Sequence, residues 1–177
     1  MQPRSILITG ASSGLGAALA AAYAAPGVTL HLGGRDRGRL ALVVDRCRLL
    51  GARASGAAID VTDAAAMAAW INAADALAPL ELVIANAGVS ASGTRALSSG
   101  DGPAVTRQIF RINLDGVLNT VLPALERIRA RPAPGKRLRG QVALVGSLAG
   151  LRGMPGSPAY SASKAAVRAW GQALAIR

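Results

Sequence analysis

The segment that decides the fold reads Ser5-Ile6-Leu7-Ile8-Thr9-Gly10-Ala11-Ser12-Ser13-Gly14-Leu15-Gly16, followed by an alanine-rich stretch from Ala17 to Ala25. The apolar, β-branched run at 5–9 predicts a buried strand, and the alanine-rich stretch predicts a helix. A glycine-rich turn between a strand and a helix lets the backbone approach a phosphate group, to which the helix presents free N–H groups and its positive dipole end. The spacing G-x-x-x-G-x-G differs from the common dinucleotide pattern G-x-G-x-x-G. The turn therefore predicts phosphate binding, with a tight turn that holds no ligand as the alternative.

Strands and helices alternate along the rest of the chain. The apolar patterns predict further strands at 28–32, 57–59, 82–85 and 141–146, and helices at 37–50, 63–78, 103–129 and from 158 to the C-terminus. Residues 90–102, rich in Ser, Gly and Thr, indicate a loop. Repeated strand–helix units predict a parallel sheet with right-handed crossovers and helices on its faces.

Composition places the chain among α/β proteins with a full hydrophobic core. The 177 residues, 51% hydrophobic and 16% charged, predict a single domain over 1–177. No apolar run reaches the roughly 20 residues of a membrane span, and the N-terminus lacks a signal-peptide pattern. We therefore expect a cytoplasmic protein without membrane contact. The single cysteine, Cys47, has no Cys or His neighbours at metal-ligand spacing, so no metal site is expected.

The formal charge of +11 is the one compositional feature that would suit nucleic acid. One arginine group comprises Arg35, Arg37 and Arg39, and a second extends from Arg127 to Arg139 with Lys136. The second group surrounds a proline-containing stretch without interleaved aromatic residues. It predicts a solvated basic loop, and no nucleic-acid partner is expected.

Several polar or glycine residues fall at the carboxyl ends of the predicted strands, where parallel sheets bind ligands. They are Gly10, Arg35, Asp60, Asn86 and Ser147. At the end of the second strand an acidic residue would suit a ribose 2′-hydroxyl and an arginine a 2′-phosphate. Arg35 stands there without an acid before it, which favours NADP over NAD.

Three other side chains at this edge have a structural reading beside the functional one. Asp36 and Asp63 are expected to cap the helices that follow them, although a register slip of one residue would bring Asp36 near the ribose. Asp60 could receive the adenine amino group. Asn113, inside the apolar face of the helix at 103–129, must find hydrogen bonds if it is buried, and backbone groups would suffice.

Tyr160 and Lys164 are four residues apart on the last predicted helix, so their side chains share one face. A free tyrosine has a pKa of about 10, and one that moves protons near neutrality needs it lowered by about 3, roughly 4 kcal/mol of preference for the anion. A neighbouring ammonium provides part of this preference. Such pairs are common on helices, however, and a solvated pair is the alternative.

Taken together, these residues resemble the short-chain dehydrogenase/reductase family in its common form. The resemblance covers residues 5–177 and involves, in order, the turn from Thr9 to Gly16, Asp60-Val61, Asn86-Ala87-Gly88, Asn113, Ser147, and Tyr160 with Lys164. It implies a Rossmann-like, doubly wound sheet of order 3-2-1-4-5 and hydride transfer between NADP(H) and a carbonyl or secondary alcohol.

The resemblance also implies roles for individual residues. Gly10, Gly14 and Gly16 would hold the pyrophosphate, and Asn86 would steady the central strands. Tyr160 would be the general acid/base, Lys164 would bind the nicotinamide ribose and favour the ionised tyrosine, Ser147 would polarise the substrate oxygen, and Asn113 would hold a relay water. The whole implied cofactor site comprises Gly10, Ser12, Ser13, Gly14, Leu15, Gly16, Arg35, Asp60, Val61, Asn86, Ala87, Gly88, Tyr160 and Lys164. NADP-preferring members often carry a basic residue at the position of Ser13, so the serine here weakens the preference for NADP.

Family members continue past the catalytic helix with two more strands and a substrate-binding segment. This chain ends inside a predicted helix, so we expect a C-terminally truncated domain with one open strand edge. The alternative function is a cofactor-binding or assembly module without catalysis of its own. The resemblance further implies a homodimer or homotetramer formed through the helices at 103–129 and 158–177.

Overall fold

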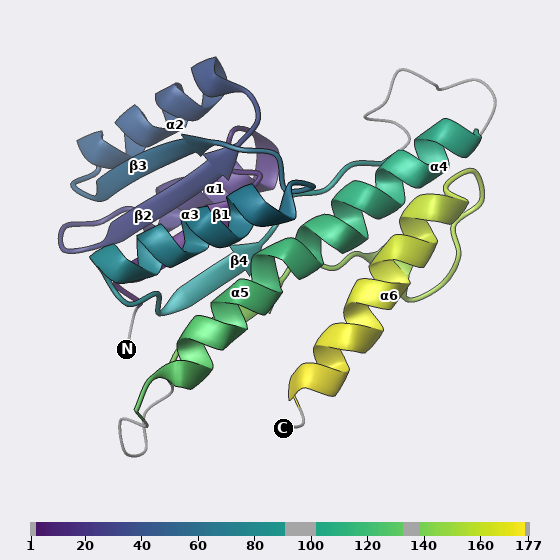
Figure 1. Cartoon of the computed structure of the whole chain (residues 1–177). Helices are drawn as coiled ribbons and strands as arrows, with labels where there is room; N and C mark the ends of the chain where they lie inside the picture. The colour runs from purple at the N-terminus through teal and green to yellow at the C-terminus, as the bar shows by residue number, and fades with distance from the viewer. Residues whose placement is uncertain (1–2, 91–101, 133–138, 176–177) are drawn as a thin grey trace.

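The computed structural model describes residues 3–90, 102–132 and 139–175 and is built around a parallel β-sheet (Figure 1). The sheet has five strands in the order β3-β2-β1-β4-β5. They are β1 (Ser5–Thr9), β2 (Thr29–Gly34), β3 (Arg53–Ala58), β4 (Leu82–Ala85) and β5 (Gln141–Leu144). In the central register Leu7 lies beside both His31 and Val83. The predicted doubly wound fold and strand order are confirmed.

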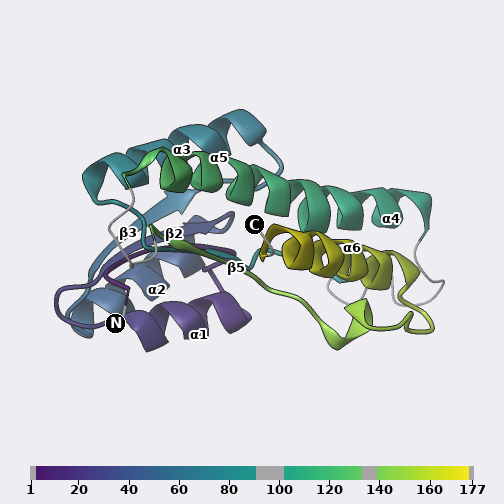
Figure 2. The same cartoon turned by 90° about the horizontal axis from the view of Figure 1, so that it is seen from below.

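Helices cover both faces of the sheet, as the two views at right angles show (Figures 1 and 2). Helices α1 (Gly14–Tyr23) and α2 (Arg37–Leu49) lie on one face, and α3 (Ala64–Leu77) and α5 (Gly116–Ala130) lie on the other. Helix α4 (Pro103–Phe110) leads into α5, and α6 (Pro158–Ala175) lies beside α4.

The central strands are apolar on both sides because both faces are covered. Ile8 and Leu30 pack in the cluster with residues of α1 and α2, whereas Leu7 and Val83 pack in the cluster with residues of α3 and α5. All four side chains are at most marginally exposed. Full burial of such a side chain stabilises the fold by about 1.5–3 kcal/mol, so these strands hold the site at their carboxyl ends rigidly.

Two helix starts follow the sequence prediction. The Asp36 carboxylate accepts a hydrogen bond from the Arg39 amide at 2.9 Å, and that of Asp63 accepts one from the Ala66 amide at 2.9 Å. Each cap stabilises its helix by about 1 kcal/mol. The capping role of both residues is confirmed.

Strand β2 extends two residues beyond its predicted end, and the added residues are glycines. A Cβ on Gly33 would lie 2.6 Å from the Trp70 ring of α3, and one on Gly34 would lie 3.0 Å from Ser12 in the glycine-rich turn. The missing side chains let both neighbours approach the strand. Because β2 ends at Gly34, Arg35 follows the strand directly, at the edge where the cleft opens.

The helix predicted at 103–129 is interrupted by a π-helical turn, Arg111–Asp115. Asn113 lies in the middle of this turn and is fully buried. A π turn inserts one extra residue into the helix and is frequent at functional sites. Apolar periodicity alone predicted a continuous helix.

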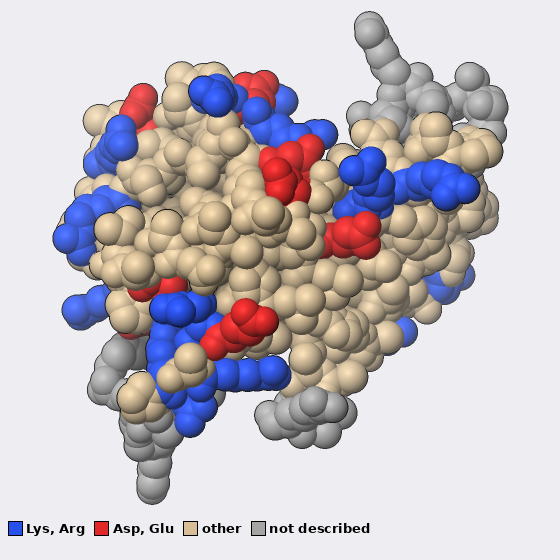
Figure 3. All heavy atoms as spheres, viewed as in Figure 1, with Lys and Arg blue, Asp and Glu red and all other residues tan. Residues whose placement is uncertain are grey.

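The prediction of a solvated basic loop is wrong for Arg131. This side chain is largely buried and donates to Asp75, and also to the backbone oxygens of Leu80 at 2.8 Å and Arg139 at 2.9 Å. Arg127 lies 3.3 Å from the other carboxylate oxygen of the buried Asp75. Figure 3 shows basic side chains scattered over one face, with a denser group accompanied by acidic side chains where α5 ends. Part of this charge thus joins α5 to α3. Residues 133–138 of the same predicted loop lie outside the described residues, and so do residues 91–101 of the loop predicted at 90–102.

Across the described residues, no helix combines the length and apolarity needed to cross a bilayer. In the same parts of the chain no three His, Cys, Asp or Glu side chains gather in a way that could hold a metal ion. Cys47 is a buried free thiol on α2.

Candidate nucleotide-binding and catalytic site

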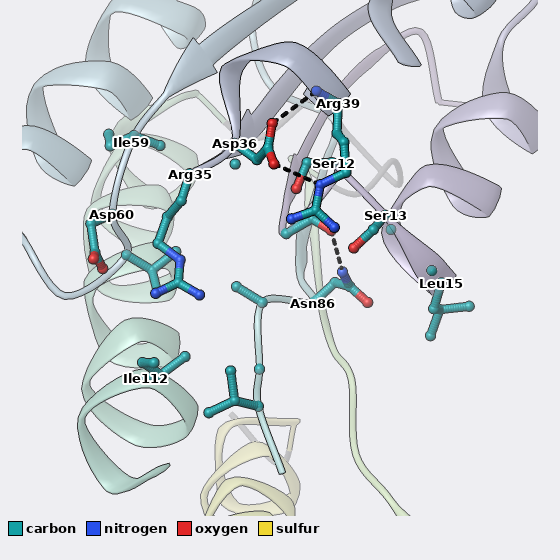
Figure 4. Close-up of a pocket in the computed structure, with 18 residues that line it drawn as sticks. Ser12, Ser13, Leu15, Arg35, Asp36, Arg39, Ile59, Asp60, Asn86 and Ile112 are labelled. Atoms are coloured by element: carbon teal, nitrogen blue, oxygen red, sulfur yellow. Dashed lines mark hydrogen bonds and ion pairs between the residues drawn. The ribbon is translucent and has the colours of Figure 1, made fainter. Parts of the chain in front are cut away.

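A cleft of about 640 Å³ opens at the carboxyl edge of the sheet (Figure 4). Of the predicted cofactor residues, all but Tyr160 and Lys164 line it. The lining also includes Asp36, which was expected near the ribose only on a register slip, and five residues that the sequence reasoning missed: Gly34, Arg39, Ile59, Val89 and Ile112. Most of these residues could have been found because they flank a predicted motif in the sequence. Arg39 belongs to the arginine group at 35–39.

The glycines of the first turn have separate structural reasons. Gly10 has a φ of +66°, and a Cβ there would lie 2.8 Å from the Ala87 Cα. A Cβ on Gly16 would lie 2.2 Å from the Gly10 oxygen and 2.6 Å from Asn86 Nδ2. Gly14 has a φ of +53° and faces open space. The turn therefore brings bare backbone and the N-terminus of α1 to the cleft, which suits a phosphate group.

Asn86 joins the ends of β1 and β4 beneath this turn. Its amide Nδ2 donates to the backbone oxygens of Thr9 at 2.9 Å and Gly10 at 3.3 Å. The Thr9 hydroxyl oxygen accepts hydrogen bonds from the backbone amides of Asn86 at 3.1 Å and Ala87 at 3.2 Å. These reciprocal bonds fix the strand ends from which the cleft is built.

Two arginines lie at the β2 end of the cleft. The Arg35 side chain points into it, between Asp60 and Asn86 (Figure 4). Asp36 is engaged by Arg39, whose Nε lies 2.8 Å from its carboxylate. Hydrogen bonding from the Arg39 amide and side chain lowers the pKa of Asp36. The carboxylate that sequence reasoning weighed as a ribose ligand is thus a cap and an ion-pair partner.

Asp60 is held at the opposite wall. Its Oδ1 accepts from the Thr62 amide and hydroxyl, both at 2.9 Å. Partial burial raises the pKa of this carboxyl, but the two Thr62 bonds, with the positive charges of Arg35 and Arg111, outweigh burial and hold the pKa below its usual range. Asp60 is therefore an ionised acceptor at neutral pH.

Lys164 is buried, with 4% of its surface exposed. Its Nζ donates to the Val145 oxygen at 2.8 Å and lies 5.9 Å from the centre of the Tyr160 ring. A Cβ on Gly88 would lie 3.5 Å from this Nζ, so the ammonium adjoins the wall of the cleft. Burial lowers the pKa of Lys164. The alternative of a solvated Tyr–Lys pair is wrong for the lysine.

Ser147 precedes a 3-10 turn, Leu148–Gly150, that packs on α6. Its Oγ accepts from the Ala149 amide at 3.2 Å. A Cβ on Gly150 would lie 2.8 Å from the Lys164 carbonyl group, so only glycine allows the turn to sit this close. The arrangement holds the Ser147 segment against the helix that carries Tyr160 and Lys164.

The Asn113 side chain is satisfied within the protein. Its Oδ1 accepts from the Val89 amide at 2.8 Å, and its Nδ2 donates to the Val89 oxygen at 2.9 Å and to Ser163 Oγ at 3.1 Å. This is the structural alternative that the sequence left open, a buried asparagine bonded to backbone. Its part in a water relay stays a prediction.

Comparison with known proteins identifies the class to which this site belongs. The family model described as short chain dehydrogenase matches residues 4–176. The chain belongs to this family. An uncharacterized oxidoreductase of Myxococcus xanthus is 38% identical over 99% of this chain. The resemblance inferred from the sequence is thereby confirmed.

Solved structures of the family that contain a bound nicotinamide cofactor have the same fold as this chain. A short chain dehydrogenase/reductase from Burkholderia phymatum in complex with NAD is 30% identical over 96% of this chain, with a TM-score of 0.81. A 3-oxoacyl (acyl-carrier-protein) reductase from Agrobacterium tumefaciens with NADP bound is 31% identical over 98%, with a TM-score of 0.82. This chain spans 66% of the Myxococcus relative and 58% and 64% of the two solved chains.

Proposed function

We propose that the protein is an NADP(H)-dependent oxidoreductase that interconverts a carbonyl compound and a secondary alcohol. The observation that carries this proposal is the buried ammonium of Lys164, which is fixed by Val145 and adjoins Gly88 in the wall of a glycine-lined cleft. A buried charge is costly unless it is used or well paired, and this one lies beside a tyrosine. Such an arrangement suits proton transfer next to a bound nucleotide.

The residues of the cleft fit a dinucleotide. The turn from Gly10 to Gly16 forms a cradle that side chains would fill, which suits the pyrophosphate. Asp60 and Val61 would flank the adenine, while Arg35, with Arg39 nearby, would receive a 2′-phosphate. Two arginines at this end and an Asp36 engaged as a cap favour NADP over NAD. Tyr160 and Lys164 would contact the nicotinamide ribose.

The nicotinamide ring supplies the hydride when the cofactor is bound. Ser147 Oγ accepts from Ala149, which leaves its proton to donate to the substrate oxygen. Tyr160 gives its proton to the developing alkoxide, and the Lys164 ammonium stabilises the resulting phenolate. The Tyr160 phenolate must then regain a proton from solvent, by way of Lys164 and a water that Asn113 would hold.

Turnover with NADPH and a panel of ketones tests the proposal. In Tyr160→Phe the ring stays and the proton is lost, so kcat should fall at least about 100-fold while NADPH binding stays within about threefold of wild type. A Phe variant that turns over normally would refute the role of Tyr160. Firm NADPH binding without turnover of any ketone would instead favour the binding or assembly module.

Three finer points belong to the same proposal. The Agrobacterium neighbour is a 3-oxoacyl (acyl-carrier-protein) reductase, so 3-oxoacyl thioesters belong in the ketone panel. We further propose a cytoplasmic homodimer or homotetramer. Leu122, 48% exposed on α5, supports an apolar contact there, and light scattering of the purified protein measures its mass.

A further inference from the structure

Two serines lie between Tyr160 and Lys164, and the mechanism above uses neither. Ser161 is 4% exposed and Ser163 is fully buried. A buried hydroxyl is costly unless it finds hydrogen-bond partners. The partners of these two serines differ, and the difference separates their roles.

Ser163 connects the catalytic helix α6 to the π-helical turn fifty positions earlier in the chain. Its hydroxyl donates to the Tyr160 backbone oxygen at 2.7 Å and accepts from Asn113 Nδ2 at 3.1 Å. The hydroxyl has one proton, which is used on Tyr160, and its lone pair receives the amide of Asn113. Both side chains are fully buried, so solvent cannot replace either bond.

Asn113 carries the connection onward to the cleft. Its amide pairs with both backbone groups of Val89, as a neighbouring strand would. Val89 lines the cleft directly after Gly88, and Gly88 in turn adjoins both Asn113 and Lys164. One series of hydrogen bonds therefore runs from the Tyr160 carbonyl through Ser163 and Asn113 to the wall of the cleft.

Lys164 provides a second anchor from the next position on the same helix, since its Nζ reaches the Val145 oxygen just beyond β5. Consecutive helical residues point about 100° apart, so the two anchors pull in different directions. One leads to the segment after β4 and the other to the segment after β5. Two such anchors restrain both the rotation of α6 about its axis and its placement relative to the segments after β4 and β5. Figure 1 shows α6 alongside α4 and α5.

We propose that Ser163 is a positioning residue that sets the placement of Tyr160 and Lys164 against the cleft by holding α6 to Asn113. This inference rests on the proposed function for its catalytic consequence. Without the hydroxyl, one N–H of Asn113 is left buried without its partner. Helix α6 is then no longer hydrogen-bonded to Asn113, and its position relative to Val89 is no longer fixed through that side chain.

The test compares Ser163→Ala with Ser161→Ala in the full protein. Ser161 is a matched control, because its hydroxyl is also buried on the same helix. Within the described residues this hydroxyl accepts from the Met154 amide at 3.0 Å and not from Asn113. Ser163→Ala should lower kcat at least about tenfold, since misplacement of reacting groups by about 1 Å can cost 100-fold. Its dissociation constant for NADPH should stay within about threefold, and Ser161→Ala should keep kcat within about threefold.

A second measurement needs neither turnover nor cofactor. The Val89 amide donates to Asn113, so its hydrogen exchange reports the connection directly. Loss of one hydrogen bond should speed this exchange about tenfold in Ser163→Ala and leave it unchanged in Ser161→Ala. If Ser163→Ala does not fold, Ser163→Cys, of similar shape but with a weak donor, serves in its place.

The two readouts separate this inference from the proposed function. Unchanged Val89 exchange in the Ser163 variant, or a kcat within twofold of wild type, overturns the positioning role. Absence of NADPH-dependent turnover in the wild type overturns the proposed function, while Val89 exchange still decides whether Ser163 holds Asn113.

Discussion

Replacing Gly16 by alanine tests how the cleft depends on close backbone packing. The Cβ would lie 2.2 Å from the Gly10 oxygen and 2.6 Å from Asn86 Nδ2. Neither neighbour is a flexible chain end, because one is backbone and the other is tied to Thr9 at 2.9 Å. Since carbon atoms prefer contacts of about 3.5 Å, the start of α1 must move away from β1 by about 1 Å.

Two opposing effects set the magnitude. Alanine in a helix gains about 1 kcal/mol over glycine. Overpacking at a rigid contact costs about 1–3 kcal/mol, and displacement of Asn86 weakens hydrogen bonds worth about 1 kcal/mol each. The steric loss exceeds the gain, and Gly16→Ala should lower the free energy of unfolding by about 2 kcal/mol. NADPH affinity should fall at least about tenfold, because the amides of the turn move with α1.

Urea unfolding measures the first quantity and fluorescence titration with NADPH the second. Gly38→Ala is the matched control, because this exposed glycine of α2 would meet only an ordinary contact at 3.6 Å; it should gain up to about 1 kcal/mol. A Gly16→Ala protein as stable as Gly38→Ala, with wild-type NADPH affinity, would refute the packing argument.

Three further perturbations follow from the described contacts. Arg35→Glu should weaken NADPH binding about 10- to 100-fold and NADH binding only a few fold, because charge-assisted hydrogen bonds contribute about 1.5–3 kcal/mol; Arg37→Glu, which does not line the cleft, should leave the NADPH dissociation constant within about threefold. Asp75→Asn retains an acceptor for the Leu80 amide but loses the negative charge between Arg127 and Arg131. Urea unfolding should show a free energy of unfolding lower by about 1–2 kcal/mol. The control Asp45→Asn, in an exposed ion pair, should lower it by less than about 0.5 kcal/mol. Burial lowers the pKa of His31, so at mildly acidic pH the unfolded chain binds a proton that the folded chain does not. Stability should therefore fall as pH drops below about 6.5, and a melting temperature equally pH-dependent in His31→Gln would contradict this assignment.

The sequence predicted the parts of the site that lie on single elements. The glycine turn, Asp60-Val61 and Asn86-Ala87-Gly88 each follow a strand, so alternation of apolar runs places them at one edge of a parallel sheet. Asp36 and Asp63 were recognised as caps because a cap is a local bond, from a side chain to an amide three residues on. The Tyr160–Lys164 pair followed from helical spacing.

Contacts between distant segments were not predictable in the same way. Asp75 meets Arg131 only because α3 and α5 pack on the same face of the sheet, and sequence reasoning assigned the arginine to a solvated loop. The π turn at Asn113 escaped notice because apolar periodicity is the same on either side of it. Arg39 reaches the cleft through the turn of α2, which the spacing of charges alone does not orient.

By itself, the sequence determined the alternation of strands and helices, the glycine-rich turn after the first strand and the shared helix face of Tyr160 and Lys164, because period, turn chemistry and helical spacing are local properties. The strand order followed from the resemblance to a family. Only the tertiary structure decided that Lys164 is buried against Val145 and that Asn113 is bonded to Val89. It also decided that Ser163 connects α6 to Asn113. These contacts link positions 19 to 50 residues apart. They arise when whole elements pack, and burial then makes each hydrogen bond obligatory.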